Sequence, residues 1–294
     1  MRVLMSCKVT NLDLHGESIK AKIAHGHLAP AHLGHLQEDH DHHFRCRDLL
    51  QKSLKQQGVE VLEVRRGMYW PDMKEIDAVI TVGGDGTLLE ASHHIRSSDV
   101  PLIGLRSSPM SVGFLCYTAV EGLEMMVQQL VQQQLPHILT PRLQASILRM
   151  DSGFETTTVP ILNDLLYTNN SPAATTRYSL RVNDKEEIQR SSGLWLATPA
   201  GSTGAIYAAG GKQVSVRSGK YQFFVRELHR IGDESRNSLH QGYFDPEVDT
   251  LLIENHCMKA MLALDGHQGT IDLAYGDQIT LQRSIPLRLV TDLL

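Results

Sequence analysis

The segment VITVGGDGTLLEA, residues 79–91, decides how the rest of the sequence is interpreted. Its glycines lie between an apolar run and a stretch with helical character. A glycine-rich turn that follows a buried strand and opens a helix points backbone N–H groups at an anion, typically a phosphate. Asp85 stands in the middle of this turn, where its carboxylate would repel a phosphate. The segment therefore predicts a phosphate-binding loop in which Asp85 has a chemical role of its own.

Two chemical roles suit a carboxylate beside phosphate. It can accept the proton of an attacking hydroxyl, or it can hold magnesium that bridges phosphate oxygens, and both roles belong to phosphoryl transfer. The loop is not GxGxxG and no GK[ST] follows, so neither a Rossmann site nor a P-loop fits. A turn-forming Asp85 is the plain alternative, but a surface turn does not need a GGDG run after a buried strand. We therefore predict a kinase-type reaction.

Composition excludes several classes of protein. The 294 residues carry a net charge of −5, with 41% hydrophobic and 21% charged residues, as in globular proteins of one or two domains. An acidic chain is a poor partner for nucleic acid, and no segment predicts a membrane span or a signal peptide. The four cysteines form no CxxC pair. We expect a cytoplasmic protein, although an organellar form without its transit peptide would have the same features.

The first 139 residues alternate between strand and helix patterns, which predicts a parallel sheet in a three-layer α/β domain. We expect strands over 2–9, 59–64, 76–82 and 100–105, and helices over 44–58, 87–95 and 120–135. Thr87 is the predicted N-cap of the middle helix. The buried faces of the outer two are predicted to be Cys46, Leu49, Leu50 and Leu54 in one, and Val120, Leu123, Val127, Leu130 and Val131 in the other.

The pattern changes near residue 140. Strand-like runs follow at 142–150, 158–167, 177–184, 194–199, 250–255 and 277–282, and few helical patterns remain. Residues 140–294 are therefore predicted to form a second, all-β-rich domain.

Residues 25–43 form a segment rich in histidine, with aspartates at positions 39 and 41. Histidine with carboxylate is a set of ligands that suits zinc. The histidines have no regular spacing, however, and we favour a polar helix–loop–helix on the surface over a metal site. Adventitious metal binding without function is a third reading, and we assign no metal ligand.

The motif GGDGT, residues 83–87, is shared by 6-phosphofructokinases, diacylglycerol and sphingosine kinases, and NAD kinases. Longer segments favour the last of these. IGLRSSPMSVGFL (103–115) resembles an NAD kinase segment that ends in Gly-Phe-Leu, and NDLLYTNNSPAATTRYSL (163–180) resembles the family's Asn-acid motif. TPAGSTGAIYAAGG (198–211) is similar to the family's TPTGSTAYSLSAGG, and ALDGHQG (263–269) is a weaker match. The chain resembles the NAD kinase family, and its pattern is most similar to that of the short NADH-kinase-like branch.

The resemblance implies a phosphofructokinase/diacylglycerol-kinase-like N-terminal domain and transfer of the ATP γ-phosphate to the 2′-hydroxyl of the adenosine ribose of NAD(H). Mg²⁺ or another divalent cation would accompany ATP. Asp85 would orient or deprotonate the hydroxyl, and Gly83, Gly84, Gly86 and Thr87 would surround the donor phosphates. The residues expected at NAD(H) are Asn163, Asp164, Arg177, Thr198, Gly201, Ser202, Thr203 and Asp265. A homodimer or homotetramer is expected from the same resemblance.

Some positions have plainer readings. Asn163 and Asp164 also suit a strand-end turn, Arg177 a surface strand, and Asp265 a hairpin turn with Gly266.

The sequence also departs from the family at two positions. Ala205 stands where the family has a tyrosine, and Arg106 where an asparagine is usual. Two other functions remain open, namely a lipid kinase of the diacylglycerol or sphingosine type and a non-catalytic dinucleotide-binding sensor. The lipid kinase lacks a basic amphipathic helix to support it, and a sensor would not need a carboxylate at position 85. The choices of NAD against NADH and of ATP against polyphosphate also stay open.

Overall fold

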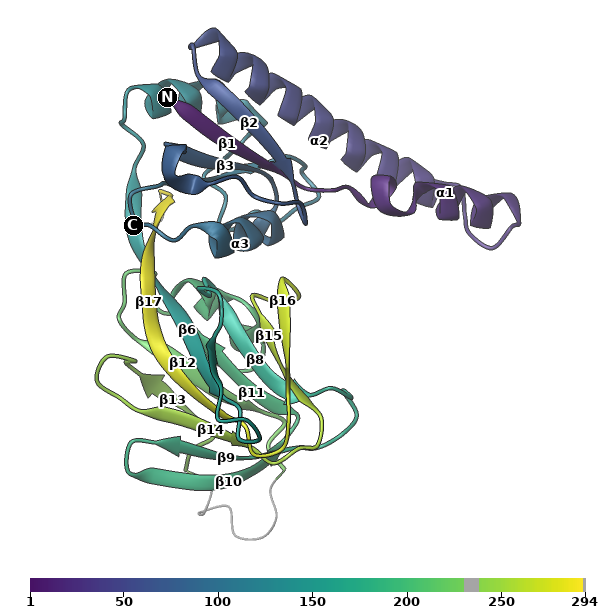
Figure 1. Ribbon diagram of the computed structural model, residues 1–294. Helices are drawn as coiled ribbons and strands as arrows, with labels where there is room; N and C mark the ends of the chain where they lie inside the picture. The colour runs from purple at the N-terminus through teal and green to yellow at the C-terminus, as the bar shows by residue number, and fades with distance from the viewer. Residues whose placement is uncertain (230–237, 293–294) are drawn as a thin grey trace. The chain divides into compact units, whose positions relative to one another are not determined.

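The computed structural model describes residues 1–229 and 238–292, and the chain forms two compact units (Figure 1). Unit 1 consists of Met1–Ile138 and Arg288–Leu294, and unit 2 of Leu139–Leu287. Each unit has its own hydrophobic core. Among the described residues, no helix has the length and apolar character needed to cross a membrane.

Unit 1 is built on a parallel sheet. The strands β1 (Arg2–Cys7), β2 (Glu60–Arg65), β3 (Ala78–Gly83) and β4 (Leu102–Arg106) lie in the order β4-β3-β1-β2. The short β5 (Thr118–Ala119) and the last residues of β17 (Gln278–Val290) pair with β4, also in parallel. Strand β3 is buried along its whole length, as expected of a strand that is covered on both faces.

Helices cover both faces of this sheet. The alternate side chains Val3, Met5 and Cys7 of β1 pack with α2 (Ala31–Gln56) and α4 (Leu123–Val131) in one core cluster. Helix α3 (Asp85–His94) lies on the opposite face of the sheet (Figure 1). There the side chain of Leu88 approaches Gly104 of β4. The short helices η1 (Met73–Glu75) and η2 (Val120–Gly122) complete the unit. The predicted three-layer α/β arrangement with a parallel sheet is confirmed.

The start of α3 differs from the prediction. The helix begins at Asp85 and its N-cap is Gly84, so Thr87 as the N-cap was wrong. Gly84 has an extended backbone (φ −113°, ψ −167°) that carries β3 directly into the helix. Thr87 instead lies inside the first turn, and its side chain packs over Gly83.

The buried faces of the two other helices were predicted only in part. Cys46, Leu50 and Leu54 are buried in α2 as expected, but Leu49 is 40% exposed. The fourth buried residue of the helix is His43. In α4 the buried residues are Leu123, Met126, Val127 and Leu130. Val120 precedes the helix in η2, and Val120 and Val131 are each 38% exposed. These two predictions were wrong, because Val120 lies before the helix and Val131 is its exposed last residue.

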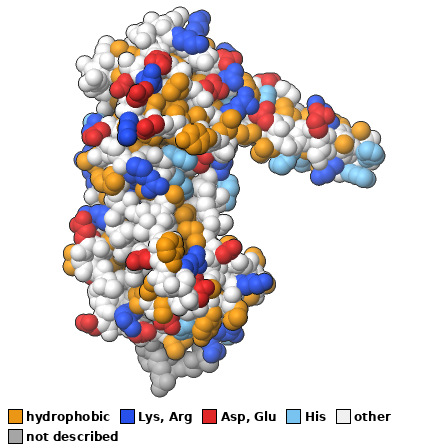
Figure 2. Space-filling view, in the orientation of Figure 1, with side chains coloured by type: hydrophobic (Ala, Val, Ile, Leu, Met, Phe, Trp, Pro, Cys, Tyr) orange, Lys and Arg blue, Asp and Glu red, His pale blue; other side chains and the backbone are white. Residues whose placement is uncertain are grey.

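The histidine-rich segment lies in a helical hairpin made of α1 (Asn11–Ala24) and α2, as a helix–loop–helix was predicted to do. Thr10 and Asp13 form a capping box that starts α1. The hairpin extends away from the sheet of unit 1, and Figure 2 shows histidine atoms along its surface. Within the described ranges 1–229 and 238–292, no three His, Cys, Asp or Glu side chains are grouped to hold a metal ion. His43 differs from the predicted polar surface segment, because it is buried with only 1% of its surface exposed.

Unit 2 contains two antiparallel layers that share one core. One sheet has the order β13 (Gln241–Phe244), β12 (Tyr221–Arg226), β11 (Gly193–Ala197), β8 (Asp164–Asn169), β15 (Ala260–Leu264) and β16 (Gly269–Leu273). The other contains β10 (Lys185–Ser191), β9 (Thr176–Val182), β14 (Leu251–Asn255), β17, β6 (His137–Leu148) and β7 (Glu155–Thr157). The helical turns η3 (Ala200–Thr203) and α5 (Ala205–Ala208) follow β11. The β-rich character predicted for this part of the chain is confirmed.

Candidate functional site

The glycine loop of unit 1 joins β3 to α3 at the carboxyl edge of the parallel sheet. The Asp85 carboxylate accepts hydrogen bonds from the backbone N–H groups of Phe114 (3.0 Å) and Leu115 (2.8 Å). These two residues belong to the segment that follows β4, so Asp85 connects the loop after β3 to the loop after β4. Each carboxylate oxygen keeps a further lone pair for another partner.

Close packing restricts two glycines of this loop to different degrees. A Cβ at Gly83 would lie 2.3 Å from Thr87 Oγ1, and a Cβ at Gly84 would lie 3.1 Å from the side chain of Ser111. Gly86 is partly exposed in the first turn of α3, and Thr87 is buried. Because the leading N–H groups of a helix have no intrahelical acceptor, this turn can bind an anion.

A buried polar network lies at the same edge of the sheet. Lys8, which follows β1, places its Nζ 2.9 Å from both carboxylate oxygens of Asp39 in α2. His43 Nδ1 lies 3.1 Å from the hydroxyl of Ser107, which follows β4. Burial is the main cause that lowers the pKa of His43 to about 4, and the charge of Lys8 contributes to the shift. Burial would raise the pKa of Asp39, but hydrogen bonds from Ser108 and Lys8 outweigh it and lower the pKa.

Sequence reasoning missed this network. Lys8 and Ser107 each follow a strand of a parallel sheet, and the carboxyl ends of such strands form the usual ligand edge. That rule, applied to every predicted strand, would have singled them out.

In unit 2, the Asn163–Asp164 pair at the start of β8 lies against the loop that follows β11. The Thr198 N–H donates to the Asn163 carbonyl oxygen at 2.9 Å. A Cβ at Gly201 would lie 2.0 Å from that same oxygen, and a Cβ at Gly204 would lie 3.6 Å from Asp164 Oδ2. The structure therefore brings these two predicted segments together and shows why Gly201 must be glycine.

Asp265 completes this cluster from the turn between β15 and β16. Its carboxylate accepts from the N–H groups of Leu162 (3.0 Å), Asn163 (2.6 Å) and Asp164 (3.1 Å), and its side chain is 1% exposed. Asp265 and Gly266 both have positive φ, 47° and 75°, as a hairpin turn requires. The residue thus forms the turn and also fixes the backbone of the Asn163–Asp164 pair.

The two side chains of the pair have unusual electrostatics. Burial, together with the charge of Asp265, raises the pKa of Asp164 to about 7, against the opposing effect of the N–H of Gly266. Asn163 Oδ1 is buried and has no hydrogen-bond partner among the described residues. A buried acceptor of this kind requires a donor. A ligand with hydroxyl groups supplies donors to both side chains.

The hydroxyl groups of the loop after β11 serve mainly the loop itself. Ser202 Oγ donates to the Val214 carbonyl oxygen (3.2 Å) and accepts from its N–H (3.1 Å). Thr198 Oγ1 donates to the Leu162 carbonyl oxygen and accepts from the Gly201 N–H. Thr203 is partly exposed at the end of η3. These residues shape the loop around the Asn163–Asp164 pair.

Arg177 is the predicted site residue that lies elsewhere. It is exposed at the start of β9, beyond the far end of β8 from Asp164. The length of β8 separates the two positions by about 17 Å. Within one chain, the structure does not bring Arg177 to the cluster.

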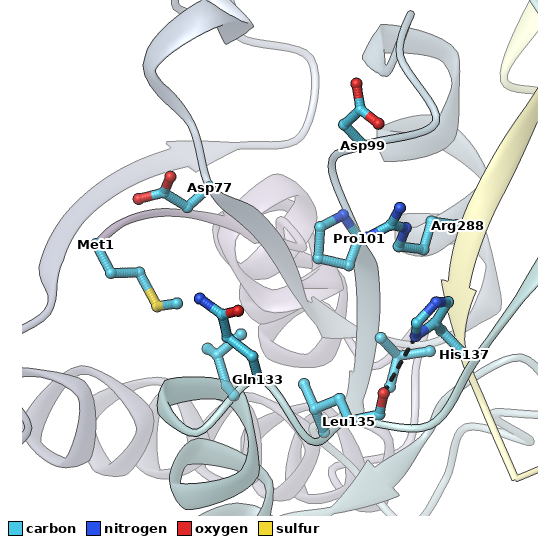
Figure 3. A pocket seen from close by; sticks show the side chains of 10 residues that line it. Met1, Asp77, Asp99, Pro101, Gln133, Leu135, His137 and Arg288 are labelled. Carbon is cyan, nitrogen blue, oxygen red and sulfur yellow. Dashed lines mark hydrogen bonds between the residues drawn. The ribbon is translucent and has the colours of Figure 1, made fainter.

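A separate cavity of about 540 Å³ lies at the amino edge of the sheet in unit 1 (Figure 3). Asp77, Pro101, His137 and Arg288 contribute to its lining, and no predicted site residue does. Ligands of parallel α/β sheets bind beyond the carboxyl ends of the strands. We therefore take the glycine loop as the candidate site of unit 1, and the Asn163–Asp164 cluster separately as the candidate site of unit 2.

The chain is similar to known proteins in both sequence and fold. The family model described as ATP-NAD kinase N-terminal domain matches residues 32–141. The NADH kinase of Arabidopsis thaliana is 31% identical over 281 residues, covering 82% of this chain and 80% of that protein. The probable NADH kinase of Oryza sativa subsp. japonica is 29% identical and covers 83% of this chain and 81% of its own length.

Two solved structures share the fold. The NAD kinase from Archaeoglobus fulgidus, solved in complex with ATP, has a TM-score of 0.69 at 21% identity and covers 99% of this chain and 94% of its own. Yeast NADH kinase, solved in complex with NADH, has a TM-score of 0.71 at 17% identity and covers 99% and 84%. At these identities the likeness establishes the fold.

Proposed function

This chain belongs to the NAD kinase family, and from that premise we propose that it transfers the γ-phosphate of ATP to the 2′-hydroxyl of the adenosine ribose of NAD(H), giving NADP(H). The observation that carries the proposal is Asp85, held by two backbone N–H groups at the start of α3 within a glycine loop. A phosphate loop needs such a carboxylate only if a proton or a cation is handled there.

In this proposal, unit 1 binds the donor. The N–H groups at the start of α3, with Gly83, Gly84, Gly86 and Thr87, surround the phosphates. Asp85 orients the acceptor hydroxyl and accepts its proton as the phosphoryl group is transferred. The hydrogen bonds from Phe114 and Leu115 fix the carboxylate in one orientation, which suits a group that must meet a proton in the transition state.

Unit 2 binds the acceptor. Asn163 and Asp164 hold the ribose hydroxyls or the adenine, and the unpartnered Asn163 Oδ1 supports this role because it needs a donor. Thr198, Gly201, Ser202, Thr203 and Asp265 shape the pocket around that pair. Arg177 is proposed to neutralise a pyrophosphate charge, although its position at the other end of β8 gives this role no support within one chain.

Magnesium enters the proposal as part of the substrate, Mg–ATP. Mg²⁺ usually keeps several waters and binds to phosphates with one or two protein carboxylates, so a dedicated protein cage is not required. The described residues fit this pattern, since Asp85 supplies a carboxylate at the loop and no three-ligand cluster is present among them. The cation would neutralise phosphate charge during transfer.

An assay of NADP(H) formation tests the function. Purified protein receives ATP and Mg²⁺ with either NAD or NADH, alongside Asp85→Asn and, as a matched change of charge on an exposed residue, Asp72→Asn. We expect product with the parent and with Asp72→Asn, and a fall of at least about 10²-fold with Asp85→Asn. The ratio of the two acceptor rates then measures the preference for NAD or NADH.

The same assay separates the alternatives. Absence of product with both acceptors, with ATP and with polyphosphate as donor, would contradict the proposal. Diacylglycerol or sphingosine in vesicles would then be tried as acceptor. A sensor would bind dinucleotide without any turnover and would bind it equally well in Asp85→Asn.

Self-association into a homodimer or homotetramer is part of the proposal. Exposed apolar side chains in unit 2 support it, among them Ile188 on β10 (72% exposed) and Met258 (81% exposed). Light scattering of the purified protein would give its mass in solution, and a monomer at micromolar concentration would contradict this part.

A further inference from the structure

A second cavity of unit 1, about 320 Å³ in volume, lies at the carboxyl edge of the parallel sheet. Its lining includes Arg45, Arg106, Ser107 and Ser108, with Glu121 as an exposed carboxylate. Cavities of this size accept part of a nucleotide rather than a whole dinucleotide. Two arginines in its lining favour an anionic group.

Arg106 is placed directly beside the glycine loop. It is the last residue of β4 and pairs in register with Gly83, and the following N–H of Ser107 donates to the Gly83 carbonyl oxygen at 3.1 Å. The stem of Arg106 lies on Gly113, where a Cβ would come within 2.7 Å of its Cδ. Gly113 also has a φ of +65°, so both the contact and the backbone require glycine there. The arginine is therefore fixed by packing.

The guanidinium of Arg106 is half-buried and has no acidic partner within ion-pair distance among the residues that the structure describes. Lys8, the cation that follows β1, is already paired with Asp39 at 2.9 Å. Asp85 and Arg106 both lie close enough to the Cys116 thiol to act on its pKa, although burial is the main cause that raises this pKa to about 12. The cation and the candidate base thus both lie near one thiol.

We propose that Arg106 binds the terminal phosphates of the donor nucleotide in this cavity, beside the glycine loop. The inference rests on the proposed kinase function and names a further donor-binding residue. A guanidinium is charged and presents two parallel N–H groups to phosphate oxygens. An asparagine side chain is neutral and cannot make this charged contact. Arg45 lies exposed on α2 at the same cavity and adds a second positive charge at its rim.

Steady-state kinetics with three substitutions at one position test this role. Arg106→Met keeps the stem that packs on Gly113 but removes the charge, Arg106→Lys keeps both, and Arg106→Asn removes both. The matched control is Arg65→Asn, because Arg65 ends β2 in the same sheet, is exposed, and lies three strand spacings, roughly 14 Å, from β4.

The expected result is a KM for ATP raised about tenfold in the Met and Asn variants, as for the loss of one charge-assisted hydrogen bond. KM for NAD(H) should stay unchanged, Lys should restore most of the parental KM for ATP, and Arg65→Asn should match the parent. A KM for ATP within about twofold of the parent in Arg106→Met would overturn the inference. A rise in KM for NAD(H) instead would also overturn it, because the bound group would then be the dinucleotide pyrophosphate.

Calorimetry with Mg–ATP keeps this test independent of turnover. If the parent makes no NADP(H), weaker Mg–ATP binding by Arg106→Met than by Arg106→Lys would still support the inference while the kinase proposal fails. A parent that binds no Mg–ATP would overturn both. The Met and Lys variants differ only in the charge at the end of an equally long stem, so a folding defect in the Asn variant does not decide the outcome.

Discussion

Two aspartates hold loops in this protein in the same way but with different exposure. Asp85 in unit 1 accepts two backbone N–H groups and stays partly exposed, whereas Asp265 in unit 2 accepts three and is 1% exposed. The carboxylate with remaining access is the one that can meet a substrate. The fully enclosed one can only shape its surroundings.

The packing around the loop in unit 2 is also tighter than the packing around the loop in unit 1. Gly201 lies against a backbone carbonyl, which cannot move without the strand, and Gly84 lies against the side chain of Ser111, which can rotate. The Asn163–Asp164 cluster of unit 2 is therefore rigid, whereas the glycine loop of unit 1 has some freedom at its surface. This contrast can be tested directly.

The largest effect is expected from Gly201→Ala. Its Cβ would lie 2.0 Å from the Asn163 carbonyl oxygen, so the strand must shift, and we expect unfolding free energy to fall by about 3 kcal/mol. Gly84→Ala, whose contact is 3.1 Å to a side chain, should cost less than about 1 kcal/mol. Urea unfolding of both variants gives the two values.

Gly34→Ala provides the control for this pair. Gly34 lies inside α2 with nothing within 4 Å of a Cβ, so alanine there should stabilise by about 0.5–1 kcal/mol. Similar losses for Gly201→Ala and Gly84→Ala would remove the contrast between the two loops.

Replacing either aspartate by asparagine is expected to lower stability less than Gly201→Ala does. Asp265→Asn should lose more stability than Asp85→Asn, whereas Asp85→Asn should lose more activity. In Asp265→Asn an amide NH₂ would face a backbone N–H that the carboxylate now accepts, at a cost of about 2 kcal/mol. Asp85→Asn makes the same mismatch with Phe114 or Leu115 in a more exposed place, at about 1 kcal/mol. Activity should nevertheless fall further in Asp85→Asn.

Thermal unfolding and the NADP(H) assay on the same samples decide this point. If Asp85→Asn lost activity only in proportion to its lost stability, Asp85 would serve the loop and not the chemistry. The exposed change Asp72→Asn should alter neither quantity.

Next in size is a pH effect of Asp164. Because its folded-state pKa of about 7 lies above the ordinary value of 3.8, the folded protein binds this proton more tightly than the unfolded chain. The resulting stabilisation is complete below the ordinary value and is lost as pH rises through about 7. The parent should therefore lose stability relative to Asp164→Asn across this window, by at most about 1.4 kcal/mol per pH unit.

Urea unfolding at several pH values measures this difference. In Asp265→Asn the charge that helps to raise the Asp164 pKa is removed, so the loss of stability should end at a lower pH and be smaller in total. Parallel pH profiles for the parent and Asp164→Asn would contradict a raised pKa.

The sequence predicted the fold well because the fold depends on local patterns. Continuous apolar runs gave β3, alternation of strands and helices gave the parallel sheet, and the change near residue 140 gave the β-rich part. The errors lie where tertiary contacts decide. Thr87 was taken as an N-cap although the extended Gly84 starts α3, and Leu49 was placed in the core where α2 buries His43 to reach Ser107.

The candidate site was predictable only as motifs. The GGDGT and TPAGSTG segments mark the loops, but nothing in the chain order shows that Asp265 contacts the Asn163–Asp164 backbone a hundred residues earlier. Nor does the sequence show that Lys8 pairs with Asp39, because the two residues are 31 positions apart and Asp39 lies within α2. Such contacts depend on the three-dimensional fold.

The smallest effect is expected from the histidine-rich segment, residues 25–43. Asp41 in this segment accepts only from the exposed side chain of Gln37 in the described contacts. A metal bound at 100 times its Kd would stabilise the folded protein by about 2.7 kcal/mol, which is several degrees in Tm. We expect zinc at 100 μM, on the order of a weak-site Kd, to shift Tm by less than about 1 °C. A larger shift in the parent that is absent in a His32→Ala/His35→Ala variant would show a metal site on the hairpin. The hairpin would then have ordered side chains, as the loops held by Asp85 and Asp265 do.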